Sequence, residues 1–149
     1  MKYAGIILFI WTFVLLNACC QKKDCIGANE MNEIKLRNFK QRDVNSVEIK
    51  TYLKNSGFAN VVDSFKTVTV DRQESDSSLI ILLNSNLDLN LDYKISITSI
   101  QKTYLLTQFS VKSIECNACF PIGHDHVTVL ESYFVNGIKQ SSGNLIITK

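Results

Sequence analysis

The densest group of reactive side chains in this chain lies between residues 116 and 126. It contains Cys116, Cys119, His124 and His126, and it includes both histidines of the sequence. Two thiolates and two imidazoles form a common tetrahedral ligand set for Zn²⁺, and Cys-x₂-Cys is a common ligand pair. Two histidines at positions i and i+2 share a face when the backbone is extended. One hypothesis for this segment is therefore a zinc site formed by the four side chains.

A structural disulfide between Cys116 and Cys119 is the interpretation that we favour. The two cysteines are close in sequence, and Pro121 and Gly123 predict a loop between two strands at this point. A compartment outside the cytoplasm would permit such a bond. A thioredoxin-like redox pair is a third alternative, but it needs a helix whose N-terminus activates the first thiol, and the proline and glycine disfavour one. Under the disulfide interpretation both histidines are solvated loop residues.

The sequence offers no recognisable catalytic motif. It lacks Gly-x-Ser-x-Gly, His-Glu-x-x-His and a glycine-rich phosphate loop. The carboxylates of Asp88 and Asp92 alternate with apolar residues, which predicts a solvated strand face and not an acid–base pair. We therefore expect a protein that is not an enzyme and that holds no cofactor.

The N-terminus has the three regions of a secretory signal. Lys2 supplies a cationic start, and residues 3–18 then carry no charge. This stretch of 16 residues is shorter than the roughly 20 apolar residues of a membrane-spanning helix. It ends in the motif Leu16-Asn17-Ala18-Cys19.

The motif resembles the lipobox of small bacterial lipoproteins of the Bacteroidota type, in which an aliphatic and a small residue precede the lipidated cysteine. The resemblance implies that residues 1–18 are a signal peptide. It also implies that Cys19 becomes the new N-terminus and carries a covalent diacylglyceryl and acyl anchor. The expected location is the cell envelope, on the outer membrane, with the rest of the chain extracytoplasmic.

If Cys19 is acylated, four of the five cysteines remain for disulfide formation: Cys20, Cys25, Cys116 and Cys119. Four cysteines allow three connectivities. A local bridge at each end of the chain is one of them, and a cross pair would clamp the N-terminal segment to the domain. The sequence leaves these alternatives open.

The overall charge limits the class of partner. The formal net charge is +2, charged residues make up 20% of the chain, and no basic block stands out. Nucleic-acid binding would need clustered lysines and arginines, so we expect no such partner. The expected partners are the membrane, through the anchor, and an unidentified protein or glycan.

The mature chain has a hydrophobic period of two. Apolar side chains occupy every odd position of residues 87–98, and polar ones occupy every even position. Asn136-Gly137 between two β-prone segments predicts a hairpin turn. Residues 45–56 fit a strand or a short helix, and we favour the strand. The other predicted strands are residues 65–70, 79–83, 104–114, 127–135, 138–140 and 145–147.

About seven strands with frequent turns predict an all-β fold, an antiparallel β-sandwich. Residues 19–32 form the lipidated N-terminus and a polar tether, and residues 33–149 form the domain. The strand at 87–97 resembles the tyrosine-corner strand of fibronectin type III domains, because Leu87 lies six residues before Tyr93 and alternating aliphatics follow. The resemblance implies an immunoglobulin- or fibronectin-like sandwich.

Together these features predict a membrane-anchored lipoprotein with a small β-sandwich that serves as a binding or structural module. The alternative is an extracytoplasmic zinc-binding lipoprotein that uses Cys116, Cys119, His124 and His126.

Overall fold

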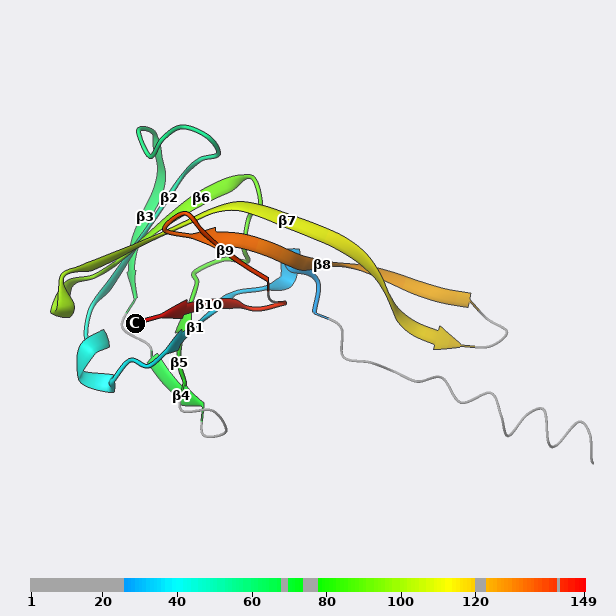
Figure 1. The fold of residues 1–149 in the computed structure, drawn as a ribbon, viewed down its shortest axis with the longest axis horizontal. Helices are drawn as coiled ribbons and strands as arrows, with labels where there is room; N and C mark the ends of the chain where they lie inside the picture. The colour runs from blue at the N-terminus through cyan, green and yellow to red at the C-terminus, as the bar shows by residue number, and fades with distance from the viewer. Residues whose placement is uncertain (1–25, 68–69, 74–77, 120–122, 142) are drawn as a thin grey trace, which may run out of the picture. The chain divides into compact units, whose positions relative to one another are not determined.

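The computed structural model describes residues 26–149 apart from 68–69, 74–77, 120–122 and 142 (Figure 1). The described residues form ten strands and three short 3₁₀ helices, η1 (Ala28–Glu30), η2 (Gln41–Val44) and η3 (Thr98–Ile100), without an α-helix. The strands are β1 (Glu33–Arg37), β2 (Val47–Leu53), β3 (Val61–Thr67), β4 (Val70–Gln73), β5 (Ser78–Leu82), β6 (Leu91–Ile97), β7 (Lys102–Cys119), β8 (Gly123–Val135), β9 (Ile138–Gln140) and β10 (Leu145–Thr148).

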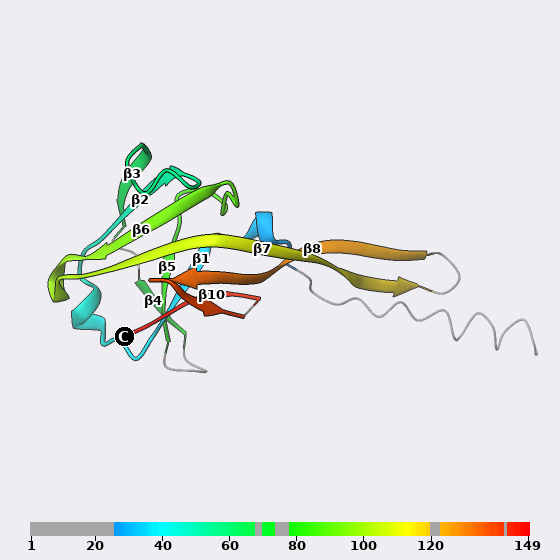
Figure 2. The same ribbon diagram turned by 45° about the horizontal axis from the view of Figure 1, so that its top comes forward.

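The strands form two sheets. One sheet has the order β10-β1-β5-β4, and the other has the order β3-β2-β6-β7-β8-β9 (Figures 1 and 2). Ser113–Val127 belongs to one structural unit, and Ile26–Lys112 with Thr128–Lys149 forms a second. In the second unit, buried side chains from both sheets make one continuous core, and the predicted all-β sandwich is confirmed.

Side-chain alternation explains how the core forms. In β6, Tyr93, Ile95 and Ile97 are buried, whereas Lys94 and Ser96 between them are only half-buried. Successive side chains of a strand point to opposite faces, so one face of β6 supplies the core. Each fully buried Ile or Leu contributes about 1.5–3 kcal/mol through removal of apolar surface from water. The segment at 45–56 is a strand, β2, as the alternation favoured.

Three features of the fold differ from the sequence predictions. Ten strands are present instead of about seven: β1 was not predicted, and the single strand predicted at residues 65–70 covers parts of two strands, β3 and β4. The pairing of β1 with β10 is parallel, although the other registered pairs among the described strands are antiparallel. The packed body also begins before residue 33, since Ala28 and Met31 are both buried in the core.

A hydrogen-bonded corner precedes β6. The hydroxyl of Tyr93 accepts the backbone N–H of Asp88 at 2.7 Å and donates to the carbonyl of the same residue at 3.2 Å. Leu87 beside it is 3% exposed. This bond to the backbone five residues upstream is the contact that defines a tyrosine corner. The strand predicted from residue 87 begins at Leu91 in the structure.

A second buried tyrosine connects the two sheets. Tyr133 of β8 is fully buried, and its hydroxyl accepts the N–H of Ile146 in β10 at 2.5 Å. The same hydroxyl lies 3.1 Å from the carbonyl of Ile146 and 3.2 Å from that of Asn144, which are its two acceptors. Burial raises the pKa of the Tyr133 phenol, so the proton needed for this donation is retained.

Phe109 of β7 packs between the two tyrosines. Its ring meets that of Tyr93 edge-on, with centroids 5.8 Å apart, and stacks on that of Tyr133 at 6.2 Å. Both distances lie in the favourable range for aromatic pairs. The corner before β6 and the connection to β10 are therefore parts of one aromatic cluster in the core.

We expect Tyr133→Phe to lower the free energy of unfolding by about 1–3 kcal/mol, because the buried N–H of Ile146 then loses its acceptor. Urea unfolding of the purified domain measures this change.

Tyr104→Phe is the matched control for that substitution. Tyr104 of β7 is also buried, but its hydroxyl has no hydrogen-bond partner among the described residues. Its removal should leave stability unchanged or slightly increased. Equal losses in the two variants would show that the hydroxyl of Tyr133 does not stabilise the sandwich.

Candidate functional site

The cysteine and histidine group lies mostly in strands and not in a loop. β7 continues through Cys119, and β8 begins at Gly123. The predicted loop was therefore too long at both ends, because β7 continues to Cys119 on one side and β8 already begins at Gly123 on the other. Residues 120–122 lie outside the described residues.

The four residues are divided between two strands. Cys116 and Cys119 both lie in β7, and His124 and His126 both lie in β8. The side chain of Cys116 is half-buried and that of His126 is exposed. The side chains of Cys119 and His124 lie outside the described part of the structure.

The sulfur of Cys116 is in a disulfide bond and does not titrate. The sulfur to which it is joined is not among the described side chains, so the pairing with Cys119 remains a prediction. No cluster of three or more potential metal ligands occurs within the described residues, a set that leaves out the side chains of Cys119 and His124.

The predicted anchor, Cys19, and the cysteines Cys20 and Cys25 lie outside the described residues. The signal peptide predicted for residues 1–18 lies there too. Among the helices that the structure does describe, none has the length and hydrophobicity to span a bilayer.

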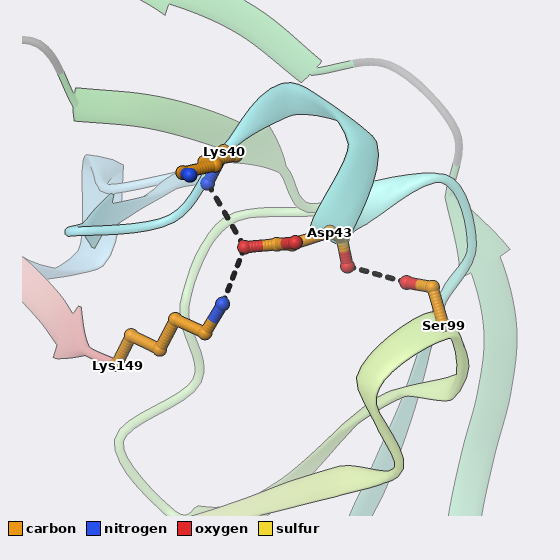
Figure 3. Close-up of polar contacts among 4 residues, drawn as sticks. All are labelled: Lys40, Asp43, Ser99 and Lys149. Carbon is orange, nitrogen blue, oxygen red and sulfur yellow. Dashed lines mark hydrogen bonds and ion pairs between the residues drawn. The ribbon is translucent and has the colours of Figure 1, made fainter.

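The structure reveals a polar cluster that the sequence did not predict, centred on Asp43 of η2 (Figure 3). One carboxylate oxygen accepts two hydrogen bonds, one from the ammonium of Lys149 at 2.5 Å and one from the backbone N–H of Lys40 at 3.1 Å. The carbonyl of Asp43 accepts the hydroxyl of Ser99 in η3. The carboxylate of Asp43 therefore joins Lys149 to η2, and the backbone carbonyl of the same residue joins η2 to η3.

The ammonium of Lys149, acting through its hydrogen bond, holds the pKa of the Asp43 carboxyl below its ordinary value of 3.8. The N–H of Lys40 acts in the same direction, and burial opposes both. The Asp43 carboxylate therefore holds two separate parts of the chain next to η2, the side chain of Lys149 and the backbone at Lys40. The spacing from Lys40 to Asp43 is a local capping signal, whereas the contact with Lys149 spans 106 positions.

Several clefts lie on the described part of the sandwich, and two of them are larger than the others that the structure describes. One, of about 290 Å³, opens near the tyrosine corner and is lined by Thr51, Asp63, Phe65 and Asp88 among others. The other, of about 480 Å³, is lined by polar and charged side chains of β7, β8 and β9: Lys112, Glu131, Ser132 and Lys139. The second lies well within the volume range typical of ligand sites, and the first lies at its lower end.

Comparison of the chain with protein-family models, curated proteins and solved structures gave no match. The site is therefore interpreted from its own residues.

Asp43→Asn should reduce stability most above about pH 4. The folded carboxyl has a lowered pKa, so its stabilising effect is present above the ordinary value of 3.8 and is lost as the pH falls through the folded value. The difference in unfolding free energy between the native chain and the variant should therefore shrink in acid. Urea unfolding from pH 7 to pH 2.5 measures it.

Lys149→Met should reproduce this pH dependence, because it removes the partner of the same carboxylate. Lys139→Met, at an exposed position of β9, is the matched control. Its unfolding free energy should vary with pH as that of the native chain does. A constant difference between the native chain and Asp43→Asn across the pH range would contradict the assignment.

Proposed function

We propose that this chain is a lipid-anchored protein of the bacterial cell envelope whose β-sandwich binds a protein or glycan partner and performs no catalysis. The observation that carries the proposal is the uncharged run of residues 3–18, which ends in Leu16-Asn17-Ala18-Cys19. η1 begins at Ala28, so only residues 20–27 separate the proposed anchor from the folded body.

The physical basis of the anchor is the burial of acyl chains. Each methylene group buried in the bilayer contributes about 0.8 kcal/mol, and a single chain binds only weakly and reversibly. A diacylglyceryl group and an amide-linked acyl chain on one cysteine supply several chains at one position. Stable attachment through Cys19 therefore requires no membrane-spanning helix.

The cleft on β7, β8 and β9 supports the binding role. Lys112 and Lys139 supply positive charge there, and Glu131 supplies negative charge. The hydroxyl of Ser110 donates to the carboxylate of Glu131 at 3.2 Å, which orients that side chain. Donors and acceptors of both signs suit a polar partner, such as a glycan or the polar rim of a protein surface.

Metabolic labelling with palmitate tests the anchor. We expect the full-length chain to incorporate label and to enter the detergent phase, and Cys19→Ser to lose both properties, because its hydroxyl cannot form the thioether. Cys20→Ser is the matched control and should retain the label. Retention of label by Cys19→Ser would contradict the proposal.

Zinc binding is the second candidate function, and the position of both histidines in β8 favours it. A zinc site needs free thiolates, and the disulfide at Cys116 removes that sulfur from the ligand set. The remaining candidates are Cys119, His124 and His126.

Metal analysis of the purified chain tests this candidate. One zinc per chain, lost in both His124→Ala and His126→Ala but retained in Cys116→Ser, would establish a site with these three ligands. Chains that hold no zinc after dialysis against excess metal would exclude it.

A further inference from the structure

We infer that the cleft on β7, β8 and β9 binds a small acidic saccharide, a sugar that carries a carboxylate. The inference rests on the proposed function and deepens it, because it names the class of partner that the sandwich takes. The polar side chains that carry the argument are Lys112 of β7, Glu131 and Ser132 of β8, and Lys139 of β9.

The size of the cleft favours a small ligand over the surface of another protein. Its volume of about 480 Å³ lies within the range of roughly 300–1,000 Å³ that is typical of small-molecule sites. A stable protein interface uses about 20–30 residues on each side. Eight residues line this cleft, so it suits an occupant of a few sugar rings.

The charge of the cleft favours an anion. Lys112 and Lys139 are both exposed, and neither forms an ion pair with another described residue. The carboxylate of Glu131 already accepts the hydroxyl of Ser110 at 3.2 Å. Two ammonium groups and one carboxylate leave the cleft positive, so a carboxylate on the ligand gains two cationic partners.

The hydroxyl of Ser132 favours a ligand that also carries hydroxyl groups. Ser132 is 4% exposed and lines the cleft, and its hydroxyl has no hydrogen-bond partner among the described residues. A polar group that is shielded from water without a partner costs free energy, which a hydrogen bond from a ligand would recover. Glu131 has further lone pairs that can accept from hydroxyl groups. A sugar ring supplies hydroxyls that both donate and accept.

The same lining disfavours a neutral sugar. No aromatic side chain is found among the described residues that line the cleft. The apolar face of a sugar ring therefore has no aromatic surface to pack on, and charge must supply most of the affinity.

A nuclear magnetic resonance titration of the mature, full-length chain in non-ionic detergent tests the inference. The probes are trigalacturonate, the neutral methyl ester of the same trisaccharide, and inorganic phosphate. We expect trigalacturonate to cause saturable shifts in the backbone amide signals of Glu131, Ser132 and Lys139, and the ester to cause none. The affinity should fall as salt is added, because both lysines are exposed to solvent.

Charge variants locate the site. Lys112→Gln and Lys139→Gln should each weaken trigalacturonate binding about tenfold, because each removes a hydrogen bond between an ammonium and the ligand carboxylate. Lys66→Gln is the matched control. It changes the net charge equally at an exposed position of β3, on the opposite edge of the same sheet, and should bind as the native chain does.

Four results would overturn the inference: equal binding of the acid and its ester, phosphate binding as tightly as trigalacturonate, an equal loss in Lys66→Gln, or no shift with either saccharide. Phosphate binding of that strength would identify a site for free anions only. The absence of any shift would leave the cleft to a protein partner.

The intact mass of the titrated sample reports the anchor separately. An acylated chain that binds no saccharide would refute this inference and leave the proposed anchor intact. A chain that binds trigalacturonate but carries no acyl group would refute the anchor and leave the saccharide site intact.

Discussion

The sandwich depends on the hydrogen bonds that the buried hydroxyl of Tyr133 makes with β10. β10 has only four residues, lies at the edge of its sheet and pairs in parallel with β1 on one side. A short edge strand gains little from its ladder alone. The phenol of Tyr133 enters from the opposite sheet and accepts the N–H of the half-buried Ile146. One hydroxyl therefore connects the two layers and holds β10 in place.

The contacts at the chain end extend this constraint. The backbone N–H of Lys149 donates to the carbonyl of Arg37 at 3.1 Å, and its ammonium pairs with Asp43. The C-terminal segment is thus held by a buried tyrosine at its start and by a buried carboxylate at its end. β1 pairs with β10 and contributes Ile34 and Leu36 to the core. The contacts that hold the C-terminal segment in place therefore also stabilise β1.

Local features of the fold could be predicted from the sequence, and long-range ones could not. The alternation in β6, the positive φ angles at Asn136 and Gly137, and the Tyr93 corner all involve residues at most a few positions apart. The parallel β1–β10 pair and the contact between Asp43 and Lys149 join residues that are more than a hundred positions apart, and no pattern in one sequence encodes them. The sequence identified the four reactive residues, but it predicted a loop where the structure has the strands β7 and β8. A proline and a glycine mark a turn without indicating how far the strands on each side continue.

The candidate site is therefore carried by two strands, with Cys116 and Cys119 in β7 and His124 and His126 in β8. The most direct test of the proposed anchor at Cys19 is the intact mass of the protein extracted from the cell envelope with detergent. The account predicts residues 19–149 carrying a diacylglyceryl group and one further acyl chain. An unmodified polypeptide recovered from the aqueous fraction would contradict it.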